Sequence, residues 1–471
     1  MTGARRTAQA RTAEDIRDRL LARLDARKKE ITRLDEYYNG DHPLSFASPQ
    51  FAQTFGKLFE TFADNWCEIV VSAAAERLAV TGFRFKSTAT EDSQQADDAA
   101  WEIWQRNNLD AESSLAMTDA IKLGTSYAFV GEDEGKAVIN IDHPADAITE
   151  SQPMNPRKVT AGLRRWIDSD GTTFVVLALT DATYTWKRGG TRPNGGTWSL
   201  TEAARNSLGV VPMVPLRNNP RTHRTHTGWR ERIGVSDITQ IMGLQDAIDK
   251  TVIDMLVASE FAGFRQRWVT GLDIPKDPAT GESLAEAWKA GASRLWTAES
   301  DKTKFGEFDV TDLSNYVGAA SMLLQHLSAQ TRTPPHYLIG QIVNASGDAL
   351  KAAETGLVAK VRSKQLVFGD DWEDIMRLAF RVEGDTERAA DTSAETIWRD
   401  PETRSQAEVT DSVIKLKTIG VPLEILLEEY GYTPQQIQRV KEVITSDNLR
   451  ALIDNLGTTN DQGDPTLPAV A

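Results

Sequence analysis

Residues 236–261 read SDITQIMGLQDAIDKTVIDMLVASEF, and this stretch decides how the rest of the chain is interpreted. Apolar residues recur in it at helical spacing, namely Ile238, Ile241, Leu244, Ile248, Val252, Met255 and Leu256. Ser236 is suited to cap the helix, and Asp237 would place a negative charge in the first turn, where the helix dipole favours one. A helix over these residues would be about 40 Å long, which is long for a globular domain.

The other face of this predicted helix is acidic. It carries Asp246, Asp249, Asp254 and Glu260, balanced only by Lys250. A second helical stretch follows at residues 312–330, and a compact insert of strands and helix separates the two. Two helices with a small distal insert are typical of a pillar that carries a tip. An amphipathic hairpin inside an ordinary helical domain explains the same spacing and stays open.

Composition indicates a folded protein of several domains. The chain has 471 residues, of which 40% are hydrophobic and 26% charged. Its net charge of −15 argues against tight binding of nucleic acid, although a protein can surround DNA without gripping it. The single cysteine, Cys67, excludes an intramolecular disulfide and a cysteine-based zinc finger. No apolar run approaches the roughly 20 residues that cross a membrane, and we expect neither a membrane span nor a secretory signal.

The periodicity predicts a mainly helical α+β fold. Helices are expected at residues 12–38, 57–78, 111–123 and 348–381, and in pieces from residue 406 onward. Residues 126–216 have the texture of strands, with a hairpin around Asp168-Ser169-Asp170-Gly171 and a proline-containing edge strand near residues 210–216. Gly420 and Gly431 are placed as helix C-caps, and the residues from 458 are expected to be disordered.

Motifs that carry enzyme chemistry are missing. The sequence holds no GxxxxGK[ST] phosphate loop, no HExxH and no GxSxG elbow. His223 and His226 could face a metal together, but no third ligand is suggested nearby, and the segment has the composition of a loop. Asp168 and Asp170 resemble the start of a calcium loop without its closing glutamate. We therefore predict no enzyme activity, no cofactor and no metal site.

Several motifs follow one another in a recognisable order. They are Tyr38-Asn39-Gly40-Asp41-His42, Asn65 through Arg77-Leu78 to Gly82-Phe83, Trp104 with Asn107-Asn108-Leu109-Asp110, Asp119 with Gly124-Thr125-Ser126-Tyr127, Gly209-Val210-Val211-Pro212-Met213-Val214-Pro215-Leu216 with Asn218-Asn219, the long helix, Thr333-Pro334-Pro335-His336-Tyr337-Leu338-Ile339-Gly340 with Asn344-Ala345-Ser346-Gly347-Asp348-Ala349-Leu350, and Gly420-Val421-Pro422 through Gly431. Together they cover about nine-tenths of the chain. On this ordered set the chain resembles the portal proteins, the head-to-tail connectors of tailed double-stranded DNA bacteriophages of the long-tailed type.

The resemblance implies a ring, usually of twelve subunits, around a central channel. It implies a wing, a helical stem, a small α/β clip, a tunnel loop and a helical crown. The corresponding residues are 1–235 for the wing, 236–262 and 311–332 for the two stem helices, 263–310 for the clip, 333–347 for the tunnel loop, 348–395 for a long wing helix and its connector, and 396–471 for the crown with its disordered tail.

A channel for DNA must not hold it, and this would explain the acidity. Asp246, Asp249 and Asp254 are predicted to face the channel and repel phosphates. Gln341, Asn344 and Ser346 in the tunnel loop would offer neutral, reversible hydrogen bonds to DNA. An ordinary helix-to-helix loop is the simpler alternative for those residues, and a solvated acidic face is the alternative for the aspartates.

The partners implied by the resemblance are the other subunits of the ring, double-stranded DNA, the large terminase subunit, a head-completion adaptor, the major capsid protein and scaffold. Trp268 and Trp296 in the clip could anchor terminase or the adaptor, because interfaces favour tryptophan, or could form the core of the clip. The expected location is the portal vertex of the virion, and the host cytoplasm during assembly. A non-portal structural adaptor, a monomeric helical scaffold and an enzyme with dispersed catalytic residues remain alternatives.

Overall fold

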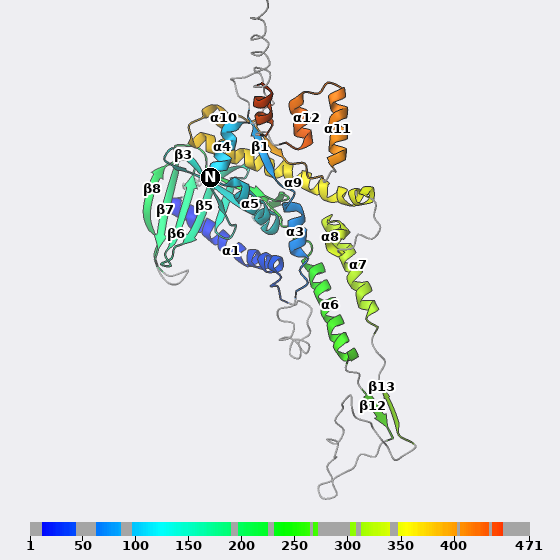
Figure 1. Cartoon of the computed structure of the whole chain (residues 1–471). Helices are drawn as coiled ribbons and strands as arrows, with labels where there is room; N and C mark the ends of the chain where they lie inside the picture. Colours follow the sequence, from blue (N-terminus) through cyan, green and yellow to red (C-terminus); the bar gives the residue numbers. More distant parts are fainter. Residues whose placement is uncertain are drawn as a thin grey trace, which may run out of the picture. The chain divides into compact units, whose positions relative to one another are not determined.

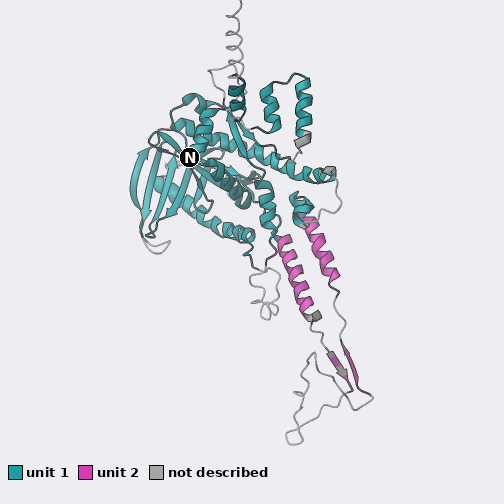
Figure 2. Ribbon diagram, in the orientation of Figure 1, with its two compact units in different colours: residues 1–42, 65–242, 328–471 teal, residues 43–64, 243–327 magenta. Residues whose placement is uncertain are grey.

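The chain divides into two compact units, each described here by itself (Figure 2). Unit 1 comprises Met1–His42, Asn65–Met242 and Ser328–Ala471, and unit 2 comprises Pro43–Asp64 and Gly243–Leu327. The computed structural model describes residues 12–43, 63–85, 97–189, 196–224, 230–263, 267–271, 302–307, 312–339, 347–402, 406–432 and 436–445.

A five-stranded antiparallel sheet forms one part of unit 1 (Figure 1). Its strands follow chain order: β4 (Ala147–Gln152), β5 (Asn155–Ile167), β6 (Thr173–Leu179), β7 (Ala182–Arg188) and β8 (Ser199–Arg205). Alternate residues point to one face, so that Leu163, Val175 and Leu177 form a buried apolar row. Helix α1 (Ala13–Asn39) covers this row with Leu20 and Leu24, which are fully buried.

Helix α1 begins and ends as its sequence predicts. The Thr12 hydroxyl accepts a hydrogen bond from the Asp15 backbone, and the Asp15 carboxylate accepts one from the Thr12 backbone, which is a capping box. Gly40 closes the helix in the left-handed conformation at φ 77°, where the missing Cβ removes the steric cost.

A second, three-stranded antiparallel sheet has the strand order β3-β2-β9 and packs against the first sheet. It consists of β2 (Thr125–Asp133), β3 (Lys136–Asp142) and β9 (Met213–Arg217). Tyr127 and Met213 pack with Ala147 and Ala178 of the five-stranded sheet in one buried cluster. Helix α5 (Leu109–Leu123) packs on β2, and the Ser126 hydroxyl donates to the Ala116 carbonyl oxygen.

Helix α9 (Gly347–Val382) is the longest helix described and packs against all three strands of this smaller sheet. Its aromatic side chains meet those of neighbouring elements: the Trp372 and Trp104 rings are 5.1 Å apart, and the Phe380 and Phe85 rings 5.0 Å. These partners lie on α4 (Asp98–Arg106) and beside β1 (Val80–Arg84), which pairs with β14 (Glu395–Trp398).

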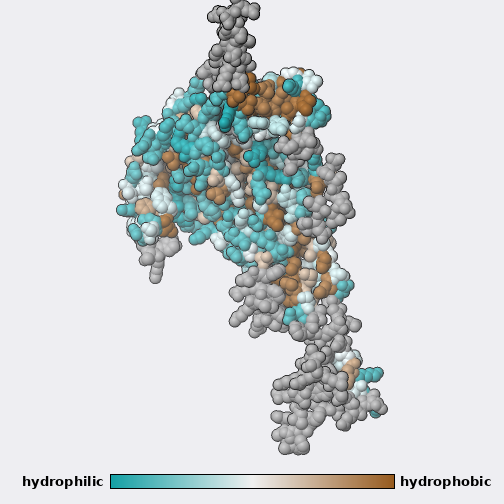
Figure 3. All heavy atoms as spheres, viewed as in Figure 1, coloured by the Kyte–Doolittle hydropathy of each residue, from teal (hydrophilic) through white to brown (hydrophobic). Residues whose placement is uncertain are grey.

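The remaining elements of unit 1 are short. They are α3 (Cys67–Ala75), β10 (Arg221–Arg224), β11 (Arg230–Ile233), α8 (Pro335–Ile339), α10 (Thr386–Ala390), α11 (Gln406–Thr418) and α12 (Leu423–Tyr430). Arg84 donates to both carboxylate oxygens of Glu428 at 3.0 Å and so fixes α12 to β1. Figure 3 shows apolar side chains gathered over α11 and α12, where Ile414 is 57% and Ile419 77% exposed.

Unit 2 contains two long helices and a two-stranded sheet. Helix α6 (Met242–Gly263) precedes β12 (Arg267–Thr270) in the chain, and β13 (Lys304–Glu307) precedes α7 (Ser314–Thr331). The strands β12 and β13 pair antiparallel, with Trp268 opposite Gly306. The described elements thus follow in the order helix, strand, strand, helix, and the first helix begins later than expected.

Helix α6 begins at Met242, so Ser236 is not its N-cap, contrary to the sequence-based prediction. Residues 234–238 instead form hydrogen bonds with the end of α5. The Asp237 backbone donates to the Ile121 carbonyl oxygen at 3.1 Å, and the Ser236 hydroxyl donates to that of Lys122. Carbonyl groups in the last turn of a helix lack donors within the helix, and these two groups provide the missing hydrogen bonds.

Two glycines permit this contact. Gly124, at φ 90°, ends α5, and a Cβ added to Gly234 would lie 1.7 Å from the Gly124 carbonyl oxygen. The Gly124 oxygen also accepts a hydrogen bond from the Asn218 backbone at 3.0 Å. The two backbones therefore touch without space for a side chain.

The expected mixture of helices and antiparallel sheet is confirmed, and most predicted elements are found. The hairpin around Asp168 is formed by β5 and β6, and β9 is an edge strand of its sheet. Gly431 caps α12 in the left-handed conformation at φ 101°. The predicted proline-rich loop after Arg332 contains one helical turn more than expected, α8, with Pro335 as its first residue.

We predict that Gly234→Ala lowers the free energy of unfolding by about 2 kcal/mol or more, because the backbone contact must open. Urea unfolding followed by circular dichroism measures this. Gly243→Ala is the matched control, since nothing lies within 4 Å of its added Cβ and alanine favours a helix. Equal stability of Gly234→Ala and wild type would show that the two backbones are not in tight contact.

Candidate functional site

The three aspartates predicted to face a channel differ in their surroundings. Asp249 is 1% exposed, and its carboxylate accepts hydrogen bonds from the Asp64 backbone at 3.0 Å and the Gln245 amide at 3.1 Å. A carboxylate buried in its own chain cannot also face a channel. Asp249 therefore does not fit its predicted role, because its side chain connects two segments of unit 2.

Asp246 and Asp254 are partly exposed on α6. The Asp254 carboxylate pairs with Lys250 at 2.5 Å, one helical turn earlier. An exposed pair of this kind contributes little to stability and leaves the local charge near zero. Among the residues predicted for the channel, Asp246 and Asp254 are the two whose accessibility is compatible with that role.

Of the two tryptophans predicted to anchor partners, Trp268 is the one among the described residues. It is 37% exposed, and a Cβ added to Gly306 on the opposite strand would lie 2.3 Å from its ring. The indole thus covers the backbone of β13 with one face. Trp296 lies outside the described residues, as do Gln341, Asn344 and Ser346 of the predicted tunnel loop.

Sequence reasoning missed a buried ion cluster in unit 1 that is centred on Asp237. The carboxylate of Asp237 is 2.8 Å from the Lys360 ammonium and 3.1 Å from that of Lys364, both on α9. It also accepts hydrogen bonds from the side-chain amides of Asn218 and Asn219, at 2.9 and 2.7 Å. The prediction treated Asp237 as an acid in a first helical turn, whereas it is the centre of this cluster.

The cluster joins segments that are far apart in sequence. Lys364 is 3% exposed and also donates to the Asn218 side-chain oxygen, at the end of β9. Lys360 donates at 3.2 Å to the carbonyl oxygen of Thr331, the last residue of α7. Through Lys360 and Lys364, one face of α9 therefore forms hydrogen bonds and ion pairs with the end of β9, the segment before α6 and the end of α7.

Charge compensation makes this burial possible. Burial alone would raise the pKa of Asp237, but Lys360 and Lys364 outweigh it and hold the pKa well below its ordinary value of 3.8. Burial lowers the pKa of Lys364 to about 8, although Asp237 opposes that change. Asp237 and Lys364 are therefore both charged near neutral pH, and the cluster contains two lysines for one carboxylate.

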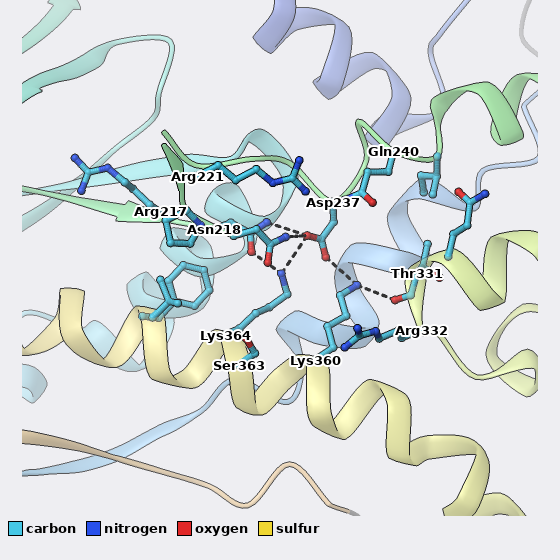
Figure 4. A pocket seen from close by; sticks show the side chains of 16 residues that line it. Arg217, Asn218, Arg221, Asp237, Gln240, Thr331, Arg332, Lys360, Ser363 and Lys364 are labelled. Carbon is cyan, nitrogen blue, oxygen red and sulfur yellow. Dashed lines mark hydrogen bonds and ion pairs between the residues drawn. The ribbon is translucent and has the colours of Figure 1, made fainter. Parts of the chain in front are cut away.

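A pocket of about 540 Å³ opens beside the cluster (Figure 4). Its lining contains five cationic side chains and one carboxylate: Arg217, Arg221, Arg332, Lys360, Lys364 and Asp237. Figure 4 shows Lys360 and Lys364 extending from α9 toward Asp237. Figure 4 shows the Arg217 side chain extending away from Asp237, and Asp371 is the acidic group that acts most strongly on it. The positive charge beside Asp237 therefore comes from the other four cations.

Two further features are absent from the part of the chain that the structure describes. No group of three or more His, Cys, Asp or Glu side chains is arranged there to hold a metal ion. None of the helices described combines the length and the apolar character needed to cross a membrane.

Comparison with protein families gives a match to the phage portal proteins described as SPP1 Gp6-like, over residues 17–448. The chain belongs to this family. The portal protein of Mycobacterium phage D29 is 31% identical, over 85% of this chain and 82% of the relative. The portal protein of Mycobacterium phage L5 is 29% identical, over 96% of this chain and 92% of the relative. The resemblance predicted from the ordered motifs is thus confirmed.

Two solved structures are similar to this portal-family chain at low sequence identity. A chain from the neck of an empty gene transfer agent particle matches 78% of it, with a TM-score of 0.42 and 9% identity, and 88% of the solved chain is covered. A chain from the virion of a native gene transfer agent particle matches 86% of it, also at a TM-score of 0.42, with 11% identity and 93% of the solved chain covered. Similarity at this level carries no argument about residues.

We predict that Asp237→Asn lowers the free energy of unfolding by about 3 to 5 kcal/mol at neutral pH, because it leaves the buried Lys364 and the partly buried Lys360 without their carboxylate. The pKa of Asp237 is lower in the folded chain than in the unfolded chain. Its contribution is therefore complete above the ordinary value of 3.8 and is lost as the pH falls below it. The difference between wild type and Asp237→Asn should accordingly shrink on acidification.

Urea unfolding at about pH 7 and at about pH 2.5 measures both effects, because only the second pH lies well below the ordinary pKa of an aspartate. Asp254→Asn is the control, because its carboxylate is in an exposed pair and should cost less than about 1 kcal/mol. A cost for Asp237→Asn no larger than that of the control would mean that the buried cluster does not stabilise unit 1.

Proposed function

We propose that this chain forms a ring at one vertex of a bacteriophage capsid and that double-stranded DNA passes through the ring during packaging and ejection. The membership of the portal family carries this proposal. The order of elements in unit 2 supports the proposal, since the strand pair β12 and β13 comes between two long helices in the sequence. We propose a structural role without catalysis, and a location at the portal vertex of the virion after assembly in the host cytoplasm.

The regions of a portal subunit are assigned on the same basis. We assign α6 and α7 to the stem, β12 and β13 to the clip, residues 333–347 to the tunnel loop, and α11 and α12 to the crown. The two sheets of unit 1, with α1, α5 and α9, form the wing. In a ring of twelve such subunits, the exposed apolar side chains of α11 and α12 would be covered by neighbouring copies.

The stem would line the channel with Asp246 and Asp254. Helix α6 carries four acidic residues and one lysine, so its net charge opposes a close approach of phosphates. The smaller this attraction, the fewer counterions DNA releases on entering and the more freely it slides. Gln341, Asn344 and Ser346 are proposed to contact DNA through neutral hydrogen bonds.

The clip is proposed to bind the large terminase subunit during packaging and a head-completion adaptor afterwards. Trp268 is an aromatic side chain with an exposed edge, as interface anchors often have, and Trp296 is proposed to act with it. The major capsid protein and scaffold are the proposed partners of the wing and crown.

We predict that the purified chain assembles into closed rings with a central hole wide enough for a duplex of about 20 Å, seen in negative-stain images at high concentration. Native mass spectrometry of the same sample gives the number of copies. A monomeric helical scaffold would remain a single compact particle at every concentration, and that result would contradict the proposal. A structural adaptor that joins a ring made by another protein would give the same single particles, and would bind to that ring.

We predict that Asp246→Lys combined with Asp254→Lys makes assembled rings retain a short duplex more tightly, by roughly tenfold at low salt, and that added salt removes the gain. Each subunit gains four units of positive charge on α6. The control is Glu132→Lys with Asp133→Lys, which makes the same charge change at an exposed hairpin of unit 1. If both double variants retain the duplex equally, α6 does not line the channel.

A further inference from the structure

Strands β10 and β11 form a two-stranded antiparallel ribbon that is part of neither larger sheet. Each strand has four residues, and two of the four are arginines. In the whole sequence, by contrast, acidic residues outnumber lysine and arginine by 68 to 53. The proposed channel does not use this concentration of positive charge, so the ribbon needs an explanation of its own.

The register of the ribbon places three of its arginines on one face. Arg224 lies directly opposite Arg230, and Thr222 lies directly opposite Arg232. Because alternate residues of a strand share a face, these four positions form one face of the ribbon, here called the arginine face. Residues that oppose each other across two strands have Cβ atoms about 5 Å apart, and alternate residues along one strand are about 7 Å apart. Three cationic residues therefore gather in a small area.

The one acidic residue of the ribbon, Glu231, lies on the opposite face, where it is paired across the strands with His223. Its carboxylate forms an ion pair with Arg23 of α1, which also lies 3.5 Å from the Glu150 carboxylate. On the arginine face, no hydrogen bond or ion pair joins the guanidinium of Arg232 to another residue that the structure describes. The acid of the ribbon thus does not neutralise the arginine face.

The pairing of Arg224 with Arg230 is unfavourable by itself. Like charges directly opposite each other destabilise an antiparallel pair of strands. Their Cβ separation of about 5 Å is shorter than the roughly 10 Å over which 0.1 M salt screens charges, so salt does not remove the repulsion. A ligand with several negative groups would offset this cost by contacting both arginines.

The composition of the arginine face favours phosphates over a protein partner. A protein interface normally has an apolar core, and none of the four residues of this face is apolar. A guanidinium presents paired N–H groups that match two phosphate oxygens. Thr222 is exposed, and threonine hydroxyls also donate to phosphates of DNA. Two-stranded ribbons are, moreover, an established means of contacting DNA.

We propose that the arginine face of the β10–β11 ribbon binds the phosphate backbone of double-stranded DNA. The choice of DNA among polyphosphates rests on the proposed function. The ribbon belongs to unit 1, so this contact is additional to the proposed channel lining on α6. Each subunit would contribute one such face, and many weak contacts to one duplex add up in a ring.

The first experiment measures binding of a short fluorescent duplex to the purified full chain by anisotropy, as a function of salt from about 50 mM upward. Arg224→Gln with Arg230→Gln should bind at least about tenfold more weakly at the lowest salt. The slope of log K against log salt should become smaller by about two, since two phosphate contacts are lost. The control is Arg157→Gln with Arg205→Gln, which removes two exposed arginines of the five-stranded sheet and the same net charge. This control should keep the wild-type slope.

A pair of single variants tests which face of the ribbon binds. Arg232→Gln removes one cation from the arginine face and leaves the Arg224–Arg230 pair unchanged, so its slope should become smaller by about one. Arg221→Gln removes one exposed cation from the opposite face of the same ribbon and should keep the wild-type slope. These single variants decide the question even if the double variant on the ribbon does not fold.

The stability of the double variant separates binding from folding. Urea unfolding should show Arg224→Gln with Arg230→Gln to be at least as stable as wild type, because the variant removes two like charges that oppose each other. Weaker duplex binding by a variant of undiminished stability supports a role of the two arginines in binding.

Three results would overturn the proposal. The first is the absence of duplex binding by wild type, and the second is the same slope for Arg232→Gln and Arg221→Gln. The third is loss of ring formation by the double variant on the ribbon with unchanged duplex binding, which would assign the arginine face to an acidic surface of a second copy. Imaging of wild-type rings is independent of all three, so failure of this proposal and failure of the proposed function are distinguishable.

Discussion

The burial of one carboxylate, Asp237, against two lysines of α9 is the constraint on which unit 1 depends. The cluster connects the end of β9, the segment that precedes α6 and the last residue of α7. A buried ion cluster contributes little net stability compared with apolar side chains of the same volume, because desolvation offsets the attraction. Its value is specificity: hydrogen bonds to Asn218 and Thr331 fix directions that apolar packing would leave free.

The distribution of charge is consistent with the proposed passage of DNA through a ring. Sliding needs weak attraction, and the acidic excess of the chain and of α6 opposes strong attraction of phosphates. The cations beside Asp237 are gathered in one recess of unit 1, where the carboxylate offsets part of their charge. Their attraction for anions therefore acts over a short range.

The sequence predicted local features well and distant contacts poorly. Periodicity placed α1 and α9 to within a few residues, and turn chemistry placed the β5–β6 hairpin, because these depend on neighbours in the chain. Asp237 and Asp249 were misassigned because their partners, Lys364 and Asp64, are 127 and 185 residues away. One signal was available: Lys360 and Lys364 are four residues apart and share a helix face, which favours a common acidic partner.

The rigidity of α9 determines how far an event at the pocket can reach. The helix has 36 residues and is about 54 Å long, and it carries both the floor lysines and the core aromatics Phe368 and Trp372. Cores packed at crystal density do not deform gradually, so a movement of Lys364 cannot be absorbed by local rearrangement around it. A displacement of the ion cluster would therefore have to move α9 together with the sheets packed on it. Because Lys360 also donates to the end of α7, such a displacement would reach the residues that lead into the predicted tunnel loop.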